Sequence, residues 1–161
     1  MNQPFASDER SQLESWLDFQ RTCLVRKCAG LDFEALTQRA LPPSALSLLG
    51  LLRHMALVEL FWFDLHFSGH EPDARYLDPN DDAVFDLDGV ELDEVYDYFV
   101  WACERSRALC ANHDLTEPMV KAFPGEDIDL RWIHFHMIEE YARHCGHADL
   151  LREMLDNSTG Y

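Results

Sequence analysis

Four long segments with apolar residues at three- and four-residue steps are the feature that most constrains this fold. They span residues 7–29, 44–67, 92–112 and 130–156. Apolar side chains at this spacing lie along one face of a helix. The sequence lacks both the alternating pattern of a half-buried strand and an internal repeat of fixed period. We therefore predict an all-α protein that folds as a four-helix bundle.

Cap and turn signals predict where these helices begin and end. Gly30 ends the first helix, and residues 32–39 are predicted to form a short helical connector. Two prolines follow, and each disfavours helical geometry in the residue before it. Ser44 is then predicted to cap the second helix. The Pro- and Gly-containing residues 68–89 and 115–129 are predicted to be long surface loops.

The charge balance limits the partners of this chain. Its 161 residues include 30 acidic and 13 basic side chains, giving a formal net charge of -17. Such a surface repels phosphate backbones and anionic headgroups, so neither nucleic acid nor a membrane is an expected partner. The first residues show no basic region followed by an apolar run, and no stretch approaches the roughly 18 apolar residues of a membrane span. We expect one domain over residues 1–161 in a cytoplasmic protein.

The cysteines give no sign of a disulfide framework. Their number is odd, and none forms a CxxC pair that would indicate a thiolate zinc site. Cysteines of this kind are usually small core residues. The five are Cys23, Cys28, Cys103, Cys110 and Cys145.

The last predicted helix carries an unusual polar stripe. At 100° per residue, His136, Glu140, His144 and His147 fall within an arc of about 80° and project toward the same neighbour. A solvated helix face would explain such a stripe. The stripe lies beside predicted core positions, however, and the apolar second helix carries a histidine, His54, among apolar neighbours.

A carboxylate and a histidine four residues apart, completed by a histidine from another helix, can supply three ligands to a metal. Glu140, His144 and His54 would form such a set and leave the remaining coordination positions open. An open site with three N/O ligands is typical of catalytic zinc, although nickel, iron and manganese accept the same ligands. The spacing alone is a weak signal, because such Glu/His pairs are common and a lone histidine on an apolar face is more often a core residue.

Two segments strengthen the metal interpretation through a resemblance. Residues 47–59 (SLLGLLRHMALVE) and 140–153 (EYARHCGHADLLRE) resemble the two signature segments of the DinB-like superfamily. They are most similar to the branch of the mycothiol-dependent maleylpyruvate isomerase and the thiol S-transferases. The resemblance implies a metal held by His54 on the second helix and by Glu140 and His144 on the fourth. Glu140 stands where many members have histidine, and the isomerase branch, which binds zinc, has glutamate.

The resemblance and the residue chemistry suggest roles for further side chains. His147 matches a position beside the site, where it would orient a ligand. Glu59 matches an acid that follows the first histidine, and a salt bridge on the helix face is its alternative. Three guanidinium groups could bind a carboxylate of a co-substrate or simply be solvated. They belong to Arg53, Arg143 and Arg152.

The resemblance favours thiol chemistry. A low-molecular-weight thiol such as mycothiol or bacillithiol would bind the open metal position, attack an electrophile and give a detoxified S-conjugate. The isomerase's additional C-terminal domain has no counterpart after Leu155, so isomerase activity is not expected. Two alternatives stay open: a non-catalytic DinB-like metal-binding stress-response protein, and a hydrolase that uses zinc-bound hydroxide. A homodimer formed through an apolar helix face is also an expectation.

Overall fold

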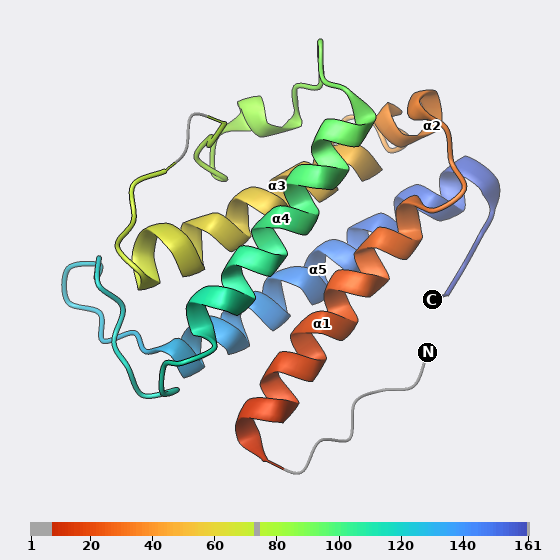
Figure 1. Cartoon of the computed structure of the whole chain (residues 1–161). Helices are drawn as coiled ribbons and strands as arrows, with labels where there is room; N and C mark the ends of the chain where they lie inside the picture. The colour runs from red at the N-terminus through yellow and green to blue at the C-terminus, as the bar shows by residue number, and fades with distance from the viewer. Residues whose placement is uncertain (1–7, 73–74, 161) are drawn as a thin grey trace.

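The computed structural model describes residues 8–72 and 75–160. Over this part of the chain the regular elements are all helical, which confirms the predicted all-α bundle (Figure 1). The elements are α1 (Glu9–Cys28), α2 (Phe33–Thr37), α3 (Leu48–Glu59), η1 (Leu60–Phe67), η2 (Asp82–Phe85), α4 (Leu92–Cys110) and α5 (Leu130–Asp156).

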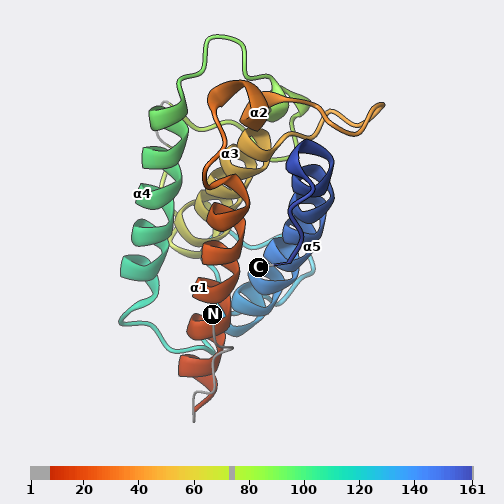
Figure 2. The same cartoon turned by 90° about the vertical axis from the view of Figure 1, so that its right-hand side faces the viewer.

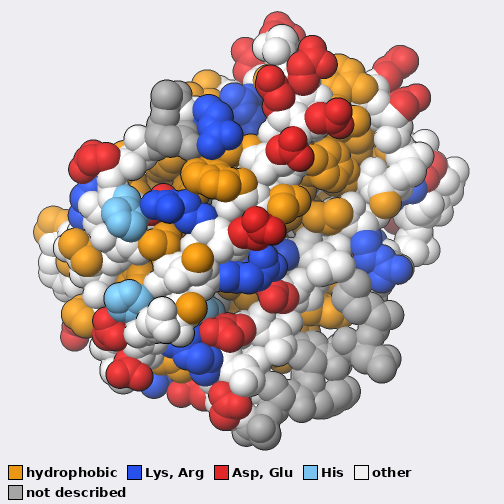
Figure 3. Space-filling view, in the orientation of Figure 1, with side chains coloured by type: hydrophobic (Ala, Val, Ile, Leu, Met, Phe, Trp, Pro, Cys, Tyr) orange, Lys and Arg blue, Asp and Glu red, His pale blue; other side chains and the backbone are white. Residues whose placement is uncertain are grey.

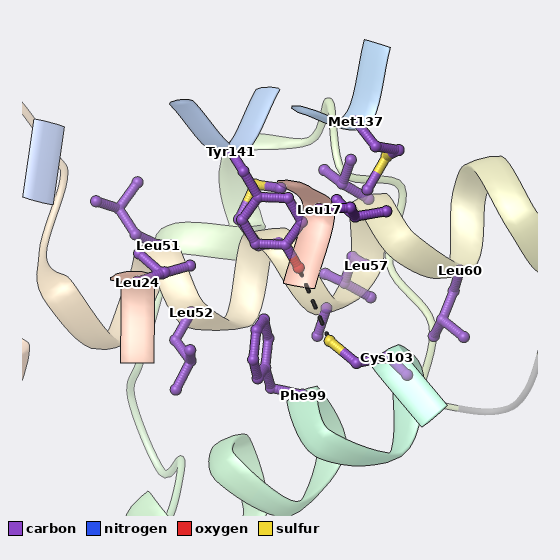
Figure 4. Close-up of a cluster of buried hydrophobic side chains, with 14 of the residues drawn as sticks. Leu17, Leu24, Leu51, Leu52, Leu57, Leu60, Phe99, Cys103, Met137 and Tyr141 are labelled. Carbon is purple, nitrogen blue, oxygen red and sulfur yellow. Dashed lines mark hydrogen bonds between the residues drawn. The ribbon is translucent and has the colours of Figure 1, made fainter. Parts of the chain in front are cut away.

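Four helical rods make up the bundle, because α3 continues without a break into η1. The helix α1 packs along α5, and α3 packs against α4 while also contacting α5 and α1 (Figures 1 and 2). The core lies between them and is rich in leucine. Leu17, Leu24, Leu51 and Met137 surround the ring of Tyr141, which is fully buried (Figure 4).

The ends of α1 and α5 follow their sequence signals. Asp8 caps α1 by accepting a hydrogen bond from the backbone N–H of Ser11, and Gly30 follows the helix with φ +78°. Asp129 caps α5 in the same way, and Asn157 ends it in the left-handed conformation. The observed bounds of α5 are those that the sequence predicted. A short polar side chain at the N-cap and a residue with positive φ after the last turn are effective boundaries.

The predicted start of the second helix is wrong. Ser47, not Ser44, is the N-cap, and its hydroxyl accepts from the backbone N–H of Gly50 at 3.2 Å. The Ser44 hydroxyl accepts instead from the N–H of Leu46, only two residues on. That local hydrogen bond competes with helix formation. The second half of the predicted helix also differs, because residues Leu60–Phe67 form a π-helix.

The two long loops cover opposite ends of this second rod. The first contains the short 3-10 helix η2, which the sequence did not predict, and buries Val84 against the bundle. Acidic side chains gather on the surface of this loop just before α4 (Figure 3). The second loop donates hydrogen bonds from the backbone of Val120 and Lys121 to the last carbonyls of η1. None of the described helices is long and apolar enough to cross a membrane.

Candidate metal centre

The structure brings together the three predicted metal ligands. His54 projects from α3, and Glu140 and His144 project from α5, with one ligand atom of each lying within 4.8 Å of the others. The Nε2 atom of His144 lies 3.5 Å from Oε2 of Glu140. The rings of His54 and His144 have centroids 4.7 Å apart and meet edge to face. Three N/O donors from two helices therefore converge on one point.

Core packing sets the direction of these side chains. Met55 and Tyr141, which directly follow His54 and Glu140 in sequence, are completely buried. Their burial fixes the rotation of α3 and α5 about their axes. The preceding residue on each helix then lies about 100° around, at the edge of the core. The side chains of Glu140 and His144 keep 18% and 12% exposure, so the site is partly shielded and still reachable from solvent.

Burial keeps both histidines neutral at physiological pH. It lowers the pKa of His54 to about 4, with a further contribution from the neighbouring His144. Burial likewise lowers the pKa of His144 to about 4, together with repulsion from His147. A neutral imidazole has a lone pair available, which is the form that binds a metal.

An unsatisfied polar atom on one of the three predicted ligands fits a bound cation. The Nδ1 atom of His54 is buried and has no hydrogen-bond partner among the described residues. Buried polar atoms are rarely left without a partner, and a metal ion would provide one. Two imidazoles and one carboxylate match the ligand set of an open zinc site. The three side chains thus fit a divalent metal, and its identity as zinc remains a prediction.

His147 lies where it can support the site. Its Nδ1 atom is 3.4 Å from Nδ1 of His144, one turn away on α5. One nitrogen must donate the hydrogen and the other accept it, so this contact links the tautomers of the two rings. When His144 is the donor, its Nε2 atom keeps a lone pair directed toward Glu140.

Glu59 belongs to a separate buried cluster. Its two carboxylate oxygens accept hydrogen bonds from Arg21, at 2.7 Å each, and Tyr141 donates to the same group at 2.8 Å. The Cys103 thiol completes the cluster beside the Tyr141 hydroxyl (Figure 4). Burial acts to lower the pKa of Arg21, but the Glu59 carboxylate raises it well above its usual value. Glu59 therefore connects α3 to α1 and α5, and sequence reasoning did not identify Arg21 as its partner.

The three arginines proposed to bind a co-substrate lie in different places. Arg53 donates to the carbonyls of Val84 and Asp86 in the first loop. It also lines a cavity of about 480 Å³ with Arg75 and Tyr98. Arg152 donates to the carbonyls at the end of α1 and pairs with Asp156. Arg143 pairs with Glu139 on the surface of α5. A role for any of them in binding a thiol remains a prediction.

Two side chains that adjoin the centre were not expected from the sequence. Phe85, at the end of η2, stacks on His54 with ring centroids 5.4 Å apart. Its position depends on how the first loop folds, which local patterns do not reveal. His136 was noted on the polar stripe without a role, and its Nε2 atom lies 3.9 Å from Oε1 of Glu140. Its ring contacts those of Trp62 and Trp132, and the contact with Trp62 joins two helices that local sequence patterns could not bring together.

Comparison with known proteins identifies the family of this chain. The profile of the family described as mycothiol S-transferase matches residues 12–157. The chain belongs to the mycothiol S-transferase family. The predicted resemblance to DinB-like proteins of this branch is thereby confirmed.

Structural comparison supports the fold of this mycothiol S-transferase family member. A solved structure of a conserved protein from Enterococcus faecalis superposes with a TM-score of 0.66 at 14% sequence identity. The match covers 95% of this chain and 100% of the other. At this identity the likeness establishes the fold alone. No protein with a curated description matches the sequence significantly.

Proposed function

We propose that this chain is a metal-dependent thiol S-transferase that acts at the centre formed by His54, Glu140 and His144. It would join a low-molecular-weight thiol of the mycothiol or bacillithiol type to an electrophile. The observation that carries the proposal is the convergence of one N/O ligand atom each from His54, Glu140 and His144 within 4.8 Å. The buried Nδ1 of His54, which has no hydrogen-bond partner among the described residues, adds to it. The family match over residues 12–157 supports a thiol as co-substrate.

The three side chains would hold the metal and define one open side. Zinc suits two neutral imidazoles and a carboxylate, and such sites keep a position for substrate. When bound there, a divalent metal lowers the pKa of an approaching thiol and so favours the nucleophilic thiolate at neutral pH. The thiol proton passes to solvent. The sulfur then forms a bond to the electrophilic carbon as the leaving group departs with its electron pair.

The remaining residues would position these ligands. His147 would accept the Nδ1 hydrogen of His144, which keeps the His144 Nε2 lone pair toward the centre. Phe85 packs flat against His54 and limits how its ring can rotate. No protein nucleophile is required. Cys145, which follows His144 in sequence, is buried and donates toward the carbonyl of Gln20, and burial raises its pKa to about 12.

A product assay tests this proposal. Metal-loaded protein is incubated with mycothiol, or separately bacillithiol, and an alkylating electrophile, and the S-conjugate is quantified by mass spectrometry. We expect conjugate to form well above the uncatalysed rate and to fall to that rate in His54→Ala. His113→Ala is the matched control, because His113 is a half-exposed histidine paired with Glu117 away from the centre.

Three outcomes would contradict the proposal. Equal rates in His54→Ala and wild type would place the chemistry elsewhere. A hydrolysed electrophile formed without added thiol would indicate a hydrolase. One bound metal with no product of either kind would support the non-catalytic metal-binding alternative.

A further inference from the structure

A group of aromatic rings adjoins the metal centre on the N-terminal side of Glu140. We call Trp62, Phe123, Trp132 and His136 the aromatic cluster. The Trp62 ring lies 4.6 Å from that of His136, 5.3 Å from Trp132 and 5.9 Å from Phe123, measured between centroids. His136 and Trp132 stack nearly in parallel at 4.8 Å. The rings come from η1, from the second loop and from α5, so the fold assembles them.

The aromatic cluster is in direct reach of a proposed metal ligand. His136 is one helical turn before Glu140, and its Nε2 atom lies 3.9 Å from Oε1 of that carboxylate. The other carboxylate oxygen of Glu140, Oε2, faces His144. A molecule resting on the cluster would therefore lie beside any thiol bound at the centre.

The cluster is built at an irregular part of the backbone and remains accessible. Trp62 belongs to the π-helix η1, whose wider turns shift side chains out of the α-helical register. Such segments occur frequently at functional sites. Trp132 keeps 42% exposure although its ring is large and apolar. An exposed indole that stacks on a second ring offers a flat surface to a ligand.

The charges around the cluster indicate which ligands suit it. The carboxylates of Glu139 and Glu140 flank His136; Glu139 is paired with Arg143, and Glu140 is a proposed ligand of the divalent metal. Because Glu139 is paired and the metal would balance the charge of Glu140, a charged ligand would find no free counter-charge among these groups. The rings stack and tilt against one another and do not surround a single point, so the arrangement differs from the cage that binds a quaternary ammonium ion. A flat, uncharged ligand fits these observations.

We infer that the aromatic cluster is the electrophile-binding site and that it selects uncharged aromatic electrophiles over small aliphatic ones. This inference rests on the proposed function. The aryl group would stack on Trp132 and Trp62, which places the adjoining electrophilic carbon next to the thiol sulfur. The new bond joins that carbon to sulfur, and the leaving group departs as an anion. The thiol proton has gone to solvent, so no other reactant is needed.

Two alkylating agents with the same reactive carbon test the preference. Iodoacetamide and N-phenyl-iodoacetamide both lose iodide, and only the second carries a ring. For each, kcat/KM of the metal-loaded protein with mycothiol is divided by the uncatalysed rate constant. We expect the phenyl compound to be favoured in the wild type, and Trp132→Ala to reduce that preference roughly three- to tenfold. Trp132→Phe should retain most of it.

A matched variant and a binding measurement separate this inference from the proposed function. Phe135→Ala removes another exposed ring of α5 that is outside the cluster, and it should leave the preference unchanged. Saturation-transfer NMR without thiol then follows acetanilide, an unreactive phenyl amide, and acetamide. We expect acetanilide to bind the wild type and to lose its signal in Trp132→Ala.

The outcomes are distinct. If neither electrophile is accelerated while acetanilide binds and depends on Trp132, the transferase proposal fails and the aromatic binding site stands. If both electrophiles are accelerated equally in wild type and Trp132→Ala, the transferase proposal stands and the inference is overturned. It is also overturned if light scattering shows a dimer that Trp132→Ala dissociates and acetanilide does not bind, because the cluster would then contact a second copy of the chain.

Discussion

Two polar clusters lie between α3 and α5, and they differ in how completely their atoms are paired. In the cluster around Glu59, the carboxylate is fully buried and accepts hydrogen bonds from Arg21 and Tyr141. In the second cluster, the candidate metal centre of His54, Glu140 and His144, the side chains are partly exposed. The buried Nδ1 of His54 has no hydrogen-bond partner in the described structure. A fully satisfied buried network is typical of a structural role, whereas an unsatisfied one at the surface leaves room for a ligand. The comparison supports a structural role for the first cluster and the proposed metal binding for the second.

The largest expected effect tests the structural role. Glu59→Ala removes the partner of Arg21 and leaves a guanidinium buried without its counter-charge. Breaking a buried ion pair in this way costs about 3–5 kcal/mol of unfolding free energy. Urea denaturation of the metal-free protein measures it. Glu14→Ala, which breaks the exposed Arg10–Glu14 pair, is the control and should cost about 0.5 kcal/mol or less. Equal effects of the two substitutions would contradict the assignment.

The pH dependence of stability tests whether His54 and His144 are buried as neutral imidazoles. In the unfolded chain His54 and His144 take up protons near pH 6.5, whereas the folded pKa of each is about 4. The unfolded state therefore binds more protons in the interval between these values, and stability falls as the pH falls below 6.5. Lowering the pH from 7.5 to 5.5 should reduce the unfolding free energy of the metal-free protein by at most about 2–3 kcal/mol for the two histidines together.

Urea denaturation at several pH values, with a chelator present, measures this dependence. The variant His144→Gln lacks one of the two groups and should show a shallower decline. A decline equally steep in the variant would mean that other groups cause it. Burial also lowers the pKa of His134, which contributes in both proteins and cancels in the comparison.

His147→Ala should weaken metal binding without removing it. The substitution leaves the three proposed ligands in place but takes away the ring that is proposed to accept from His144 and orient it. Loss of such a supporting residue typically reduces metal affinity about 10–100-fold. A competition titration with a chromophoric chelator measures the change. An unchanged affinity would show that the contact between the two rings has no part in binding.

The smallest expected effect comes from Tyr141→Phe. This substitution removes one hydrogen bond to Glu59 and keeps both bonds from Arg21. A single hydrogen bond contributes about 1 kcal/mol, so the loss of stability should be well below that of Glu59→Ala. Metal affinity should not change, although Tyr141 directly follows Glu140. A large drop in metal affinity would mean that the two clusters are coupled.

Local sequence patterns determine much of this fold and only part of the site. The apolar spacing predicted α5 from Leu130 to Asp156, because that signal lies within the segment. The start of α3 was misplaced, since Ser44 and Ser47 are both good caps and the choice depends on packing. The π-helix and η2 also depend on tertiary contacts.

The same distinction applies to the functional residues. Glu140 and His144 could be paired from their spacing, His54 was noted as a histidine in an apolar helix, and the family resemblance strengthened the set. The partnership of Arg21 with Glu59 joins residues 38 positions apart, and the aromatic cluster joins three separate segments. Neither has a local pattern, so only the folded structure reveals them.

Metal stoichiometry tests the central claim most directly. Elemental analysis is made on untagged wild-type protein, on His54→Ala, on Glu140→Gln and on the control His113→Ala, each after exchange into metal-free buffer and with the helical content checked by circular dichroism. The account predicts one equivalent of divalent metal in the wild type and the control, less in Glu140→Gln and none in His54→Ala, with the helical signal retained in all. A fully metallated His54→Ala protein would contradict the site, and so would a wild type that binds no metal when zinc is supplied.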